Sequence, residues 1–245
     1  MYKQAGFYVR KTLVEDIVFN VFFTDLSKPW IIFLPGLPQY IHKHWYLKDL
    51  IQDYCVLNPY YPGSFHSFGE FTPTSFTKTV DTSITLLETK EFFDHFEQKA
   101  FEHTGVISGI WGLSFGANLI VEYLSRTSNV DIPVVIVSPM LKMSMPVLND
   151  YWKQKTRFLA SPVYQNIFRG LNDAAFRDWL NSTEALEIPP KTRGVLLYGK
   201  NDRYMDADFL SAKFSALDIH ILEEYAHEVD NIIGFYVKSN YAINN

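Results

Sequence analysis

The pattern of hydrophobic and polar positions predicts strands that alternate with helices along most of the chain. Residues 5–12 and 15–23 alternate and are rich in β-branched and aromatic side chains, which is typical of a hairpin. Trp30–Leu34 is short and wholly apolar, as strands covered on both faces are. Further strands are expected at 54–57, 106–111, 134–137, 195–198 and 220–222, and helices at 43–52, 72–98, 115–126, 206–217 and 229–238.

Alternating strands and helices imply right-handed crossovers, so the expected fold class is α/β, with a mostly parallel central sheet and helices on both faces. Residues 139–190 break the alternation, because they hold helical patterns but no convincing strand. A connection of that length needs structure of its own. We therefore expect residues 1–138 and 191–245 to form the core and 139–190 to form an inserted helical cap.

Composition narrows the possible partners. The chain has 245 residues, 47% of them hydrophobic, and 22 Lys and Arg against 27 Asp and Glu give a net charge of −5. This weakly acidic balance without a basic block makes a nucleic-acid partner unexpected. The single cysteine, Cys55, excludes an intrachain disulfide and a multi-cysteine metal site.

Two further features bear on location. No run approaches about 18 consecutive apolar residues, so no transmembrane segment is expected. The first ten residues lack the apolar stretch and cleavage site of a secretory signal, which leads us to expect a cytoplasmic protein.

The sharpest motif is Gly112-Leu113-Ser114-Phe115-Gly116, a Gly-x-Ser-x-Gly pattern between a predicted strand and a predicted helix. The pattern alone is common by chance, but this context favours a nucleophile elbow. A nucleophile on such a strained turn needs small residues two positions away on each side, and Gly112 and Gly116 provide them. The following helix would direct its N-terminal N–H groups at the site.

An elbow also needs two oxyanion donors. One is expected from the backbone N–H of Phe115, directly after the serine, and the other from a loop after an earlier strand. Leu37, in the sequence Phe33–Pro38, has that position. A simple strand-end turn would explain the same residues, and the two interpretations are compatible.

The serine also needs a histidine base and a carboxylate that orients it, and the three residues are expected along the chain in the order Ser, Asp, His. Asp202 follows a predicted strand, and Asp206 is the better candidate for capping the next helix, which leaves Asp202 free. Of seven histidines, His227 lies after the last strand and before the final helix. His220 lies within a strand pattern, and His103 is expected to be exposed to solvent.

Together these residues resemble the α/β-hydrolase family over nearly the whole chain. The loop 35–38 resembles the family's His-Gly-x-Pro oxyanion loop, and 58–67 resembles its Asp-x-x-Gly-x-Gly-x-Ser loop. Pro35 stands where the family usually has His, Asn58 where it usually has Asp, and Ser64 where it usually has Gly. The chain is thus similar to a divergent member of the family.

The resemblance implies a serine hydrolase that cleaves an ester or thioester. It implies Ser114 as nucleophile, His227 as base and Asp202 as its orienting partner, with Leu37 and Phe115 as oxyanion donors. Neither a metal nor an organic cofactor is required. The many aromatic residues of the expected cap favour a small to medium, largely apolar acyl group.

Two alternatives remain open. The same triad could serve an acyltransferase or a carbon–carbon bond hydrolase, since the sequence does not fix the final acyl acceptor. A non-catalytic protein that binds a small molecule is also compatible, because fold does not fix function. The presence of all three triad residues favours an enzyme.

Overall fold

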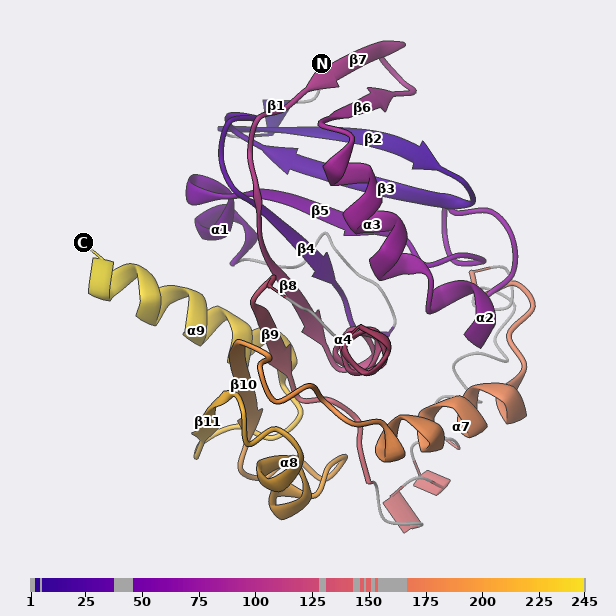
Figure 1. Cartoon of the computed structure of the whole chain (residues 1–245), viewed down its shortest axis with the longest axis vertical. Coiled ribbons are helices and arrows are strands. Elements are labelled where there is room, and N and C mark those ends of the chain that lie inside the picture. The colour runs from indigo at the N-terminus through magenta and orange to yellow at the C-terminus, as the bar shows by residue number, and fades with distance from the viewer. Residues whose placement is uncertain are drawn as a thin grey trace.

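A central sheet organises the computed structural model, which describes residues 3–4, 6–37, 46–127, 131–142, 146–147, 149–150, 153 and 167–244 (Figure 1). Within these ranges one sheet has the strand order β1 (Lys3–Gln4), β2 (Phe7–Val14), β3 (Ile17–Phe23), β5 (Cys55–Pro59), β4 (Trp30–Leu34), β8 (Ile107–Leu113), β9 (Val134–Val137), β10 (Gly194–Gly199) and β11 (Asp218–Leu222).

The sheet is mostly parallel, as the sequence predicts. β2 and β3 form the expected antiparallel hairpin, and β3 runs antiparallel to β5. From β5 to β11 every neighbouring pair is parallel. Parallel strands bring their carboxyl ends to one edge of the sheet, where functional groups gather in open α/β folds.

Helices cover both faces of the sheet. α1 (Leu47–Asp53) and α9 (Val229–Asn244) pack on one face, whereas α3 (Thr79–Glu88), α4 (Phe115–Arg126) and α8 (Ala207–Lys213) pack on the other. Figure 1 shows α4 end-on beside β8 and β9. The sequence of β4 is wholly apolar because its alternate side chains enter two separate cores, one on each face of the sheet.

The single helix predicted over residues 72–98 is wrong in its second half. The chain instead forms α2 (Pro73–Phe76) and then α3, which ends at Glu88. A two-stranded antiparallel hairpin of β6 (Glu91–Asp94) and β7 (Lys99–Glu102) follows.

Alternating burial explains this hairpin. Phe92 is buried and stacks on Phe101, with 5.4 Å between ring centroids. Asp94 is buried as well and forms an ion pair with Arg10 of β2, at 3.3 Å between Oδ2 and Nε. Residues two positions apart point the same way in a strand but nearly opposite ways in a helix. Only a strand therefore buries both Phe92 and Asp94.

The expectation that His103 is exposed is also wrong. The hairpin returns the chain to the sheet, where the backbone N–H of His103 donates to the carbonyl of Lys90 at 2.9 Å. His103 is 4% exposed, and its imidazole lies against Trp30, with ring centroids 4.6 Å apart. Burial, together with the charge of Lys90, lowers the pKa of His103.

The expected cap at 139–190 is described only in part, because most of 143–166 lies outside the described residues. Its described portion contains α7 (Asp173–Ser182) and a short 3-10 turn, Thr183–Ala185. The division of the chain into core and cap stays a prediction.

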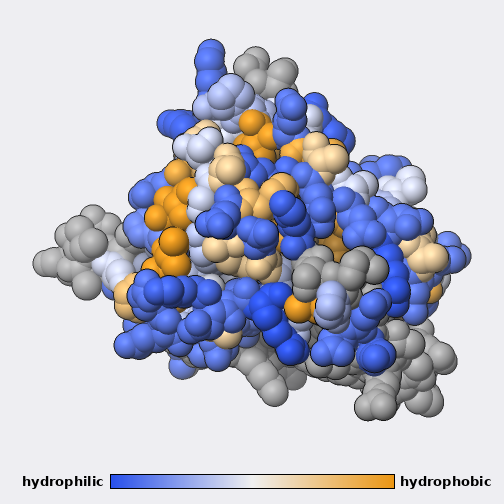
Figure 2. Space-filling model, turned by 90° about the horizontal axis from the view of Figure 1, so that it is seen from below, coloured by the Kyte–Doolittle hydropathy of each residue, from blue (hydrophilic) through white to orange (hydrophobic). Residues whose placement is uncertain are grey.

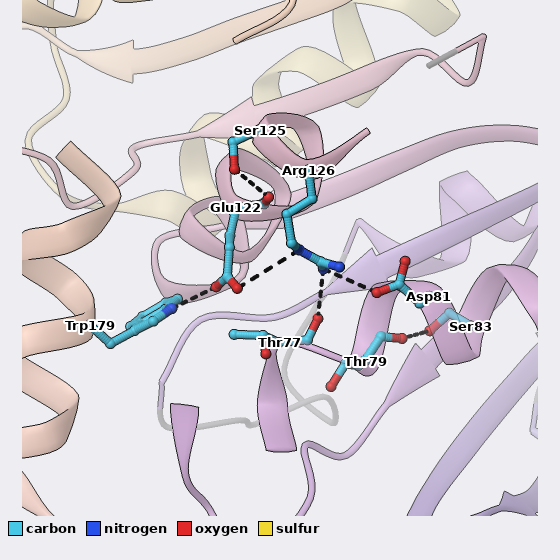
Figure 3. Close-up of polar contacts among 8 residues, drawn as sticks. All are labelled: Thr77, Thr79, Asp81, Ser83, Glu122, Ser125, Arg126 and Trp179. Atoms are coloured by element: carbon cyan, nitrogen blue, oxygen red, sulfur yellow. Dashed lines mark hydrogen bonds and ion pairs between the residues drawn. The ribbon is translucent and has the colours of Figure 1, made fainter. Parts of the chain in front are cut away.

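A polar network attaches α7 to the core (Figure 3). The indole N–H of Trp179 donates to Glu122 Oε2 on α4 at 2.6 Å. Arg126, one turn further along α4, lies 3.9 Å from Glu122 Oε1 and donates to Asp81 Oδ2 of α3 at 3.0 Å. The Trp179 ring also packs edge-on against Phe76, with 4.7 Å between centroids. One carboxylate thus connects α7 to α4.

We expect the free energy of unfolding to depend on pH through Glu122, and the substitution Glu122→Gln should remove this contribution. Burial raises the pKa of Glu122, although Trp179 and Arg126 oppose the shift. The folded protein therefore holds this proton more tightly than the unfolded chain, and stability falls as pH rises above about 4.3, where the unfolded group ionises. The variant keeps an oxygen for Trp179, so its stability relative to the wild type should grow between pH 4 and pH 7. Urea unfolding at both pH values measures this, and a constant difference would contradict it.

The surface in Figure 2 is largely polar. Hydrophilic residues cover most of the described part of this face, and apolar residues form small groups between them. Among the helices of the described ranges, none has the length and hydrophobicity needed to cross a bilayer.

Candidate active site

Ser114 occupies the sharp turn between β8 and α4, at the carboxyl edge of the sheet. Its backbone angles are φ 50° and ψ −111°, a region that residues other than glycine rarely adopt. The turn is held on both sides, because the Ser114 N–H donates to Val137 O at 2.9 Å and its carbonyl accepts from Ala117 and Asn118. Such a turn projects the serine side chain away from the sheet.

The two glycines of the motif lie where no side chain fits. A Cβ atom on Gly116 would lie 2.1 Å from the carbonyl oxygen of Leu34, in β4. A Cβ on Gly112 would lie 2.5 Å from the carbonyl oxygen of Gly116. Both close approaches involve backbone atoms, so the crossing of α4 over the strands requires glycine at both positions.

Ser114, His227 and Asp202 form one series of hydrogen bonds. Ser114 Oγ lies 3.0 Å from His227 Nε2, and His227 Nδ1 lies 2.7 Å from Asp202 Oδ2. The other carboxylate oxygen, Oδ1, accepts from the N–H of Tyr204 at 2.9 Å. The Asp202 side chain is inaccessible to solvent. An imidazole that donates from Nδ1 to this carboxylate presents Nε2 as an acceptor for the serine hydroxyl proton.

Asp206 has the separate role that the sequence predicts. It is the N-cap of α8, and its side chain accepts from the N–H of Phe209 at 2.9 Å. The two neighbouring carboxylates are thereby distinguished, since Asp206 completes a helix and Asp202 contacts the imidazole.

Contacts between the loops after β10 and β11 place Asp202 beside His227. The N–H of Asn201 donates to Tyr225 O at 3.1 Å. A Cβ on Gly199 would lie 2.3 Å from that same oxygen, so the loops approach as closely as glycine allows. Gly199 carries a structural role that the sequence analysis did not assign.

Tyr204 is a further neighbour of the site that the sequence analysis missed. Its ring lies edge-on to the His227 ring, with 4.8 Å between centroids. Only its position two residues after Asp202 could have indicated it.

One proposed oxyanion residue directly follows the serine, and the other belongs to a loop that comes close to it. Phe115 is the first residue of α4, directly after Ser114. The loop that carries Leu37 also reaches the serine, because a Cβ on Gly36 would be 3.3 Å from the Cβ of Ser114. Pro38, the last residue of the predicted loop motif, lies outside the described residues.

Cys55 is a poor alternative to Ser114 as a nucleophile. Burial raises the pKa of Cys55 to about 12, so this thiol stays protonated and unreactive at neutral pH. No three His, Cys, Asp or Glu side chains come together as ligands for a metal ion within the described ranges.

Comparison with known proteins identifies the fold. No protein-family model and no curated protein sequence matches the chain. Among solved structures, the lip1 protein of Acinetobacter baumannii AYE is similar, with a TM-score of 0.63 and 13% identity over 97% of this chain and 90% of that one. The esterase Pf2001 of Pyrococcus furiosus has a TM-score of 0.58 and 14% identity, over 95% of this chain and 92% of its own.

A third similar structure names its superfamily. It is one of the epoxide hydrolases of the α/β-hydrolase superfamily found in metagenomes from hot environments. Its TM-score is 0.59, at 14% identity over 96% of this chain and 97% of that one. The order and direction of the parallel strands, the strained serine turn and these similarities together show that the chain has the α/β-hydrolase fold.

Proposed function

We propose that the protein is a serine hydrolase that cleaves an ester or thioester through an acyl-enzyme intermediate on Ser114. The observation that carries this proposal is the hydrogen-bonded series from Asp202 through His227 to Ser114, at 2.7 Å and 3.0 Å. The strained backbone of Ser114 supports it, because such strain persists only where the surrounding structure maintains it. An α/β-hydrolase fold provides a suitable setting for this chemistry.

The reaction has two halves. His227 Nε2 takes the proton from Ser114 Oγ as that oxygen attacks the substrate carbonyl, and the oxyanion forms against the N–H groups of Leu37 and Phe115. His227 then protonates the leaving alkoxide or thiolate, which departs and leaves an acyl ester on Ser114. In the second half His227 Nε2 deprotonates a water molecule as its oxygen attacks this ester. His227 then returns the proton to Ser114 Oγ as the acyl bond breaks, which releases the acid and restores the serine. Asp202 accepts the hydrogen bond from His227 Nδ1 throughout and orients the imidazole.

The residue after Ser114 belongs to a buried aromatic cluster that extends to α7. The ring of Phe115 is fully buried and lies 4.9 Å from Tyr61, 5.1 Å from Phe76 and 5.4 Å from Trp179, measured between ring centroids. α7, in the predicted cap, supplies Trp179. The many aromatic residues of the predicted cap support a small to medium, largely apolar acyl group as the expected substrate component.

Labelling with a fluorophosphonate probe tests the proposed nucleophile. The probe forms a covalent bond with an activated serine, and the intact mass of the protein shows the adduct. We expect one adduct on the wild type and none on Ser114→Ala. A matched control is Ser138→Ala, which removes another buried serine with positive φ, directly after β9, and should keep the adduct.

A panel of esters and thioesters with increasing acyl length then identifies the preferred substrate class. Product analysis in the presence of an added alcohol separates hydrolysis from acyl transfer. If the folded wild-type protein gave no adduct, the hydrolase proposal would fail and a non-catalytic small-molecule-binding protein would be favoured.

A further inference from the structure

β4 and β5 remain in contact beyond the point where their backbones stop pairing, through two side chains that follow the paired part of β5. The parallel pairing ends at Ile32 opposite Leu57. Beyond that point Asn58 Nδ2 donates to the carbonyl of Phe33 at 2.8 Å, and the Tyr61 hydroxyl donates to the carbonyl of Pro35 at 2.6 Å. Side-chain donors thus hold the end of β4 and the residue after it where the backbone of β5 no longer pairs with β4.

The carbonyl that Tyr61 holds lies close to the proposed oxyanion donor. Pro35 O belongs to a planar peptide unit with the N–H of Gly36, and the next peptide unit contains the N–H of Leu37. Only the two backbone torsions of Gly36 separate these units, and glycine restricts them less than any other residue. With the Pro35 carbonyl held, these two torsions are the only backbone freedom left between the anchored peptide unit and the Leu37 N–H.

Tyr61 also contacts the second proposed donor residue. Its ring lies edge-on to the ring of Phe115, with 4.9 Å between centroids and 79° between the planes. Its own carbonyl accepts from Ser64 Oγ at 2.6 Å, which fixes the backbone that carries the ring. Tyr61 is fully buried, and burial raises the pKa of its hydroxyl well above the ordinary value. The hydroxyl therefore remains a donor across the working pH range.

We infer that Tyr61 is a positioning residue for the oxyanion hole, whose hydroxyl holds the Pro35 carbonyl so that the Leu37 N–H is directed at the developing oxyanion. This inference rests on the proposed acyl-enzyme function of Ser114. Tyr61 itself does not touch the reacting atoms in this arrangement, since its hydroxyl is engaged with the loop backbone.

The test compares Tyr61→Phe with Tyr60→Phe on the best ester of the panel. Tyr61→Phe removes one oxygen and keeps the ring against Phe115, so it should fold, and urea unfolding checks this. Tyr60 is an adjacent, buried tyrosine that packs in the core on the other face of the sheet, and its hydroxyl bonds to Asn20. It supplies the same chemical change on the opposite face of the sheet from Tyr61.

We expect Tyr61→Phe to lower kcat by roughly tenfold or more, with KM within about twofold of the wild type. Complete loss of an oxyanion donor costs about 10²–10³ in kcat, and a misdirected donor should cost part of that. An alkyl trifluoromethyl ketone, which adds to the serine as a tetrahedral oxyanion, should bind more weakly to Tyr61→Phe in proportion to kcat/KM. Tyr60→Phe should leave all three quantities unchanged.

Two outcomes would overturn the inference: wild-type values of kcat and ketone affinity in Tyr61→Phe, or equal losses in both variants. Failure of the proposed function is recognised separately, because the wild-type protein would then form no fluorophosphonate adduct. A wild type that is labelled at Ser114 while Tyr61→Phe keeps full activity would contradict only the role of Tyr61.

Discussion

Asp202→Asn is expected to lower kcat by about 10⁴-fold while the protein stays folded. Asp202 Oδ1 accepts from the N–H of Tyr204, and Oδ2 faces His227 Nδ1. In the variant the amide oxygen keeps the bond to Tyr204, which directs the amide NH₂ group at Nδ1. A donor in that place requires an unprotonated Nδ1 and moves the ring proton to Nε2, where it faces Ser114. The imidazole can then no longer accept the serine proton.

Asp206→Asn is the matched control, because it makes the same chemical change four positions away. Asp206 caps α8, and asparagine is about as good an N-cap as aspartate. Steady-state kinetics on the best ester at neutral pH should therefore show full activity for Asp206→Asn, and urea unfolding should show little change in either variant. Full activity in Asp202→Asn, or equal losses in the two variants, would contradict the assignment of Asp202.

Local patterns account for the parts of the fold that the sequence predicts correctly. Trp30–Leu34 forms a strand with the predicted bounds, and Asp206 is the predicted cap, because short-range spacing and residue type determine both. The mostly parallel sheet follows from the order of such elements. The same local reasoning selects Ser114, Asp202 and His227, and the structure brings their side chains within hydrogen-bonding distance. Their catalytic roles remain predictions.

Contacts between distant residues account for what the sequence analysis missed. Phe92 continues a helical spacing locally, whereas the hairpin is favoured by the contacts of Phe92 with Phe101 and of Asp94 with Arg10. His103 is buried for the same reason, since the hairpin returns it to Trp30. The hydroxyl of Tyr61 meets the carbonyl of Pro35 only after β4 and β5 have paired. None of these partners is visible in the sequence around the residue itself.

Gly116→Ala should both destabilise the fold and disable the serine. The added Cβ would lie 2.1 Å from the oxygen and 2.6 Å from the carbonyl carbon of Leu34, backbone atoms of a central strand. α4 would have to move away from β4 and would carry with it the Phe115 N–H and the turn at Ser114. Overpacking in a core costs about 1–3 kcal/mol and occasionally more, and we expect the upper end here because no flexible side chain can yield. Fluorophosphonate labelling should slow at least roughly tenfold, by analogy with the loss of one oxyanion donor.

Gly109→Ala separates this steric effect from a general intolerance of alanine in the region. Gly109 lies in β8, and its added Cβ would first meet the Trp111 side chain at 3.0 Å, which can shift. We expect a smaller loss of unfolding free energy and nearly normal labelling for Gly109→Ala.

Alanine has the higher helix propensity, by about 1 kcal/mol over glycine, so intrinsic preference alone would make Gly116→Ala more stable. A measured loss of unfolding free energy in Gly116→Ala would therefore report the tertiary contact with Leu34. Wild-type stability and labelling in that variant would show that the crossing of α4 over β4 does not depend on glycine.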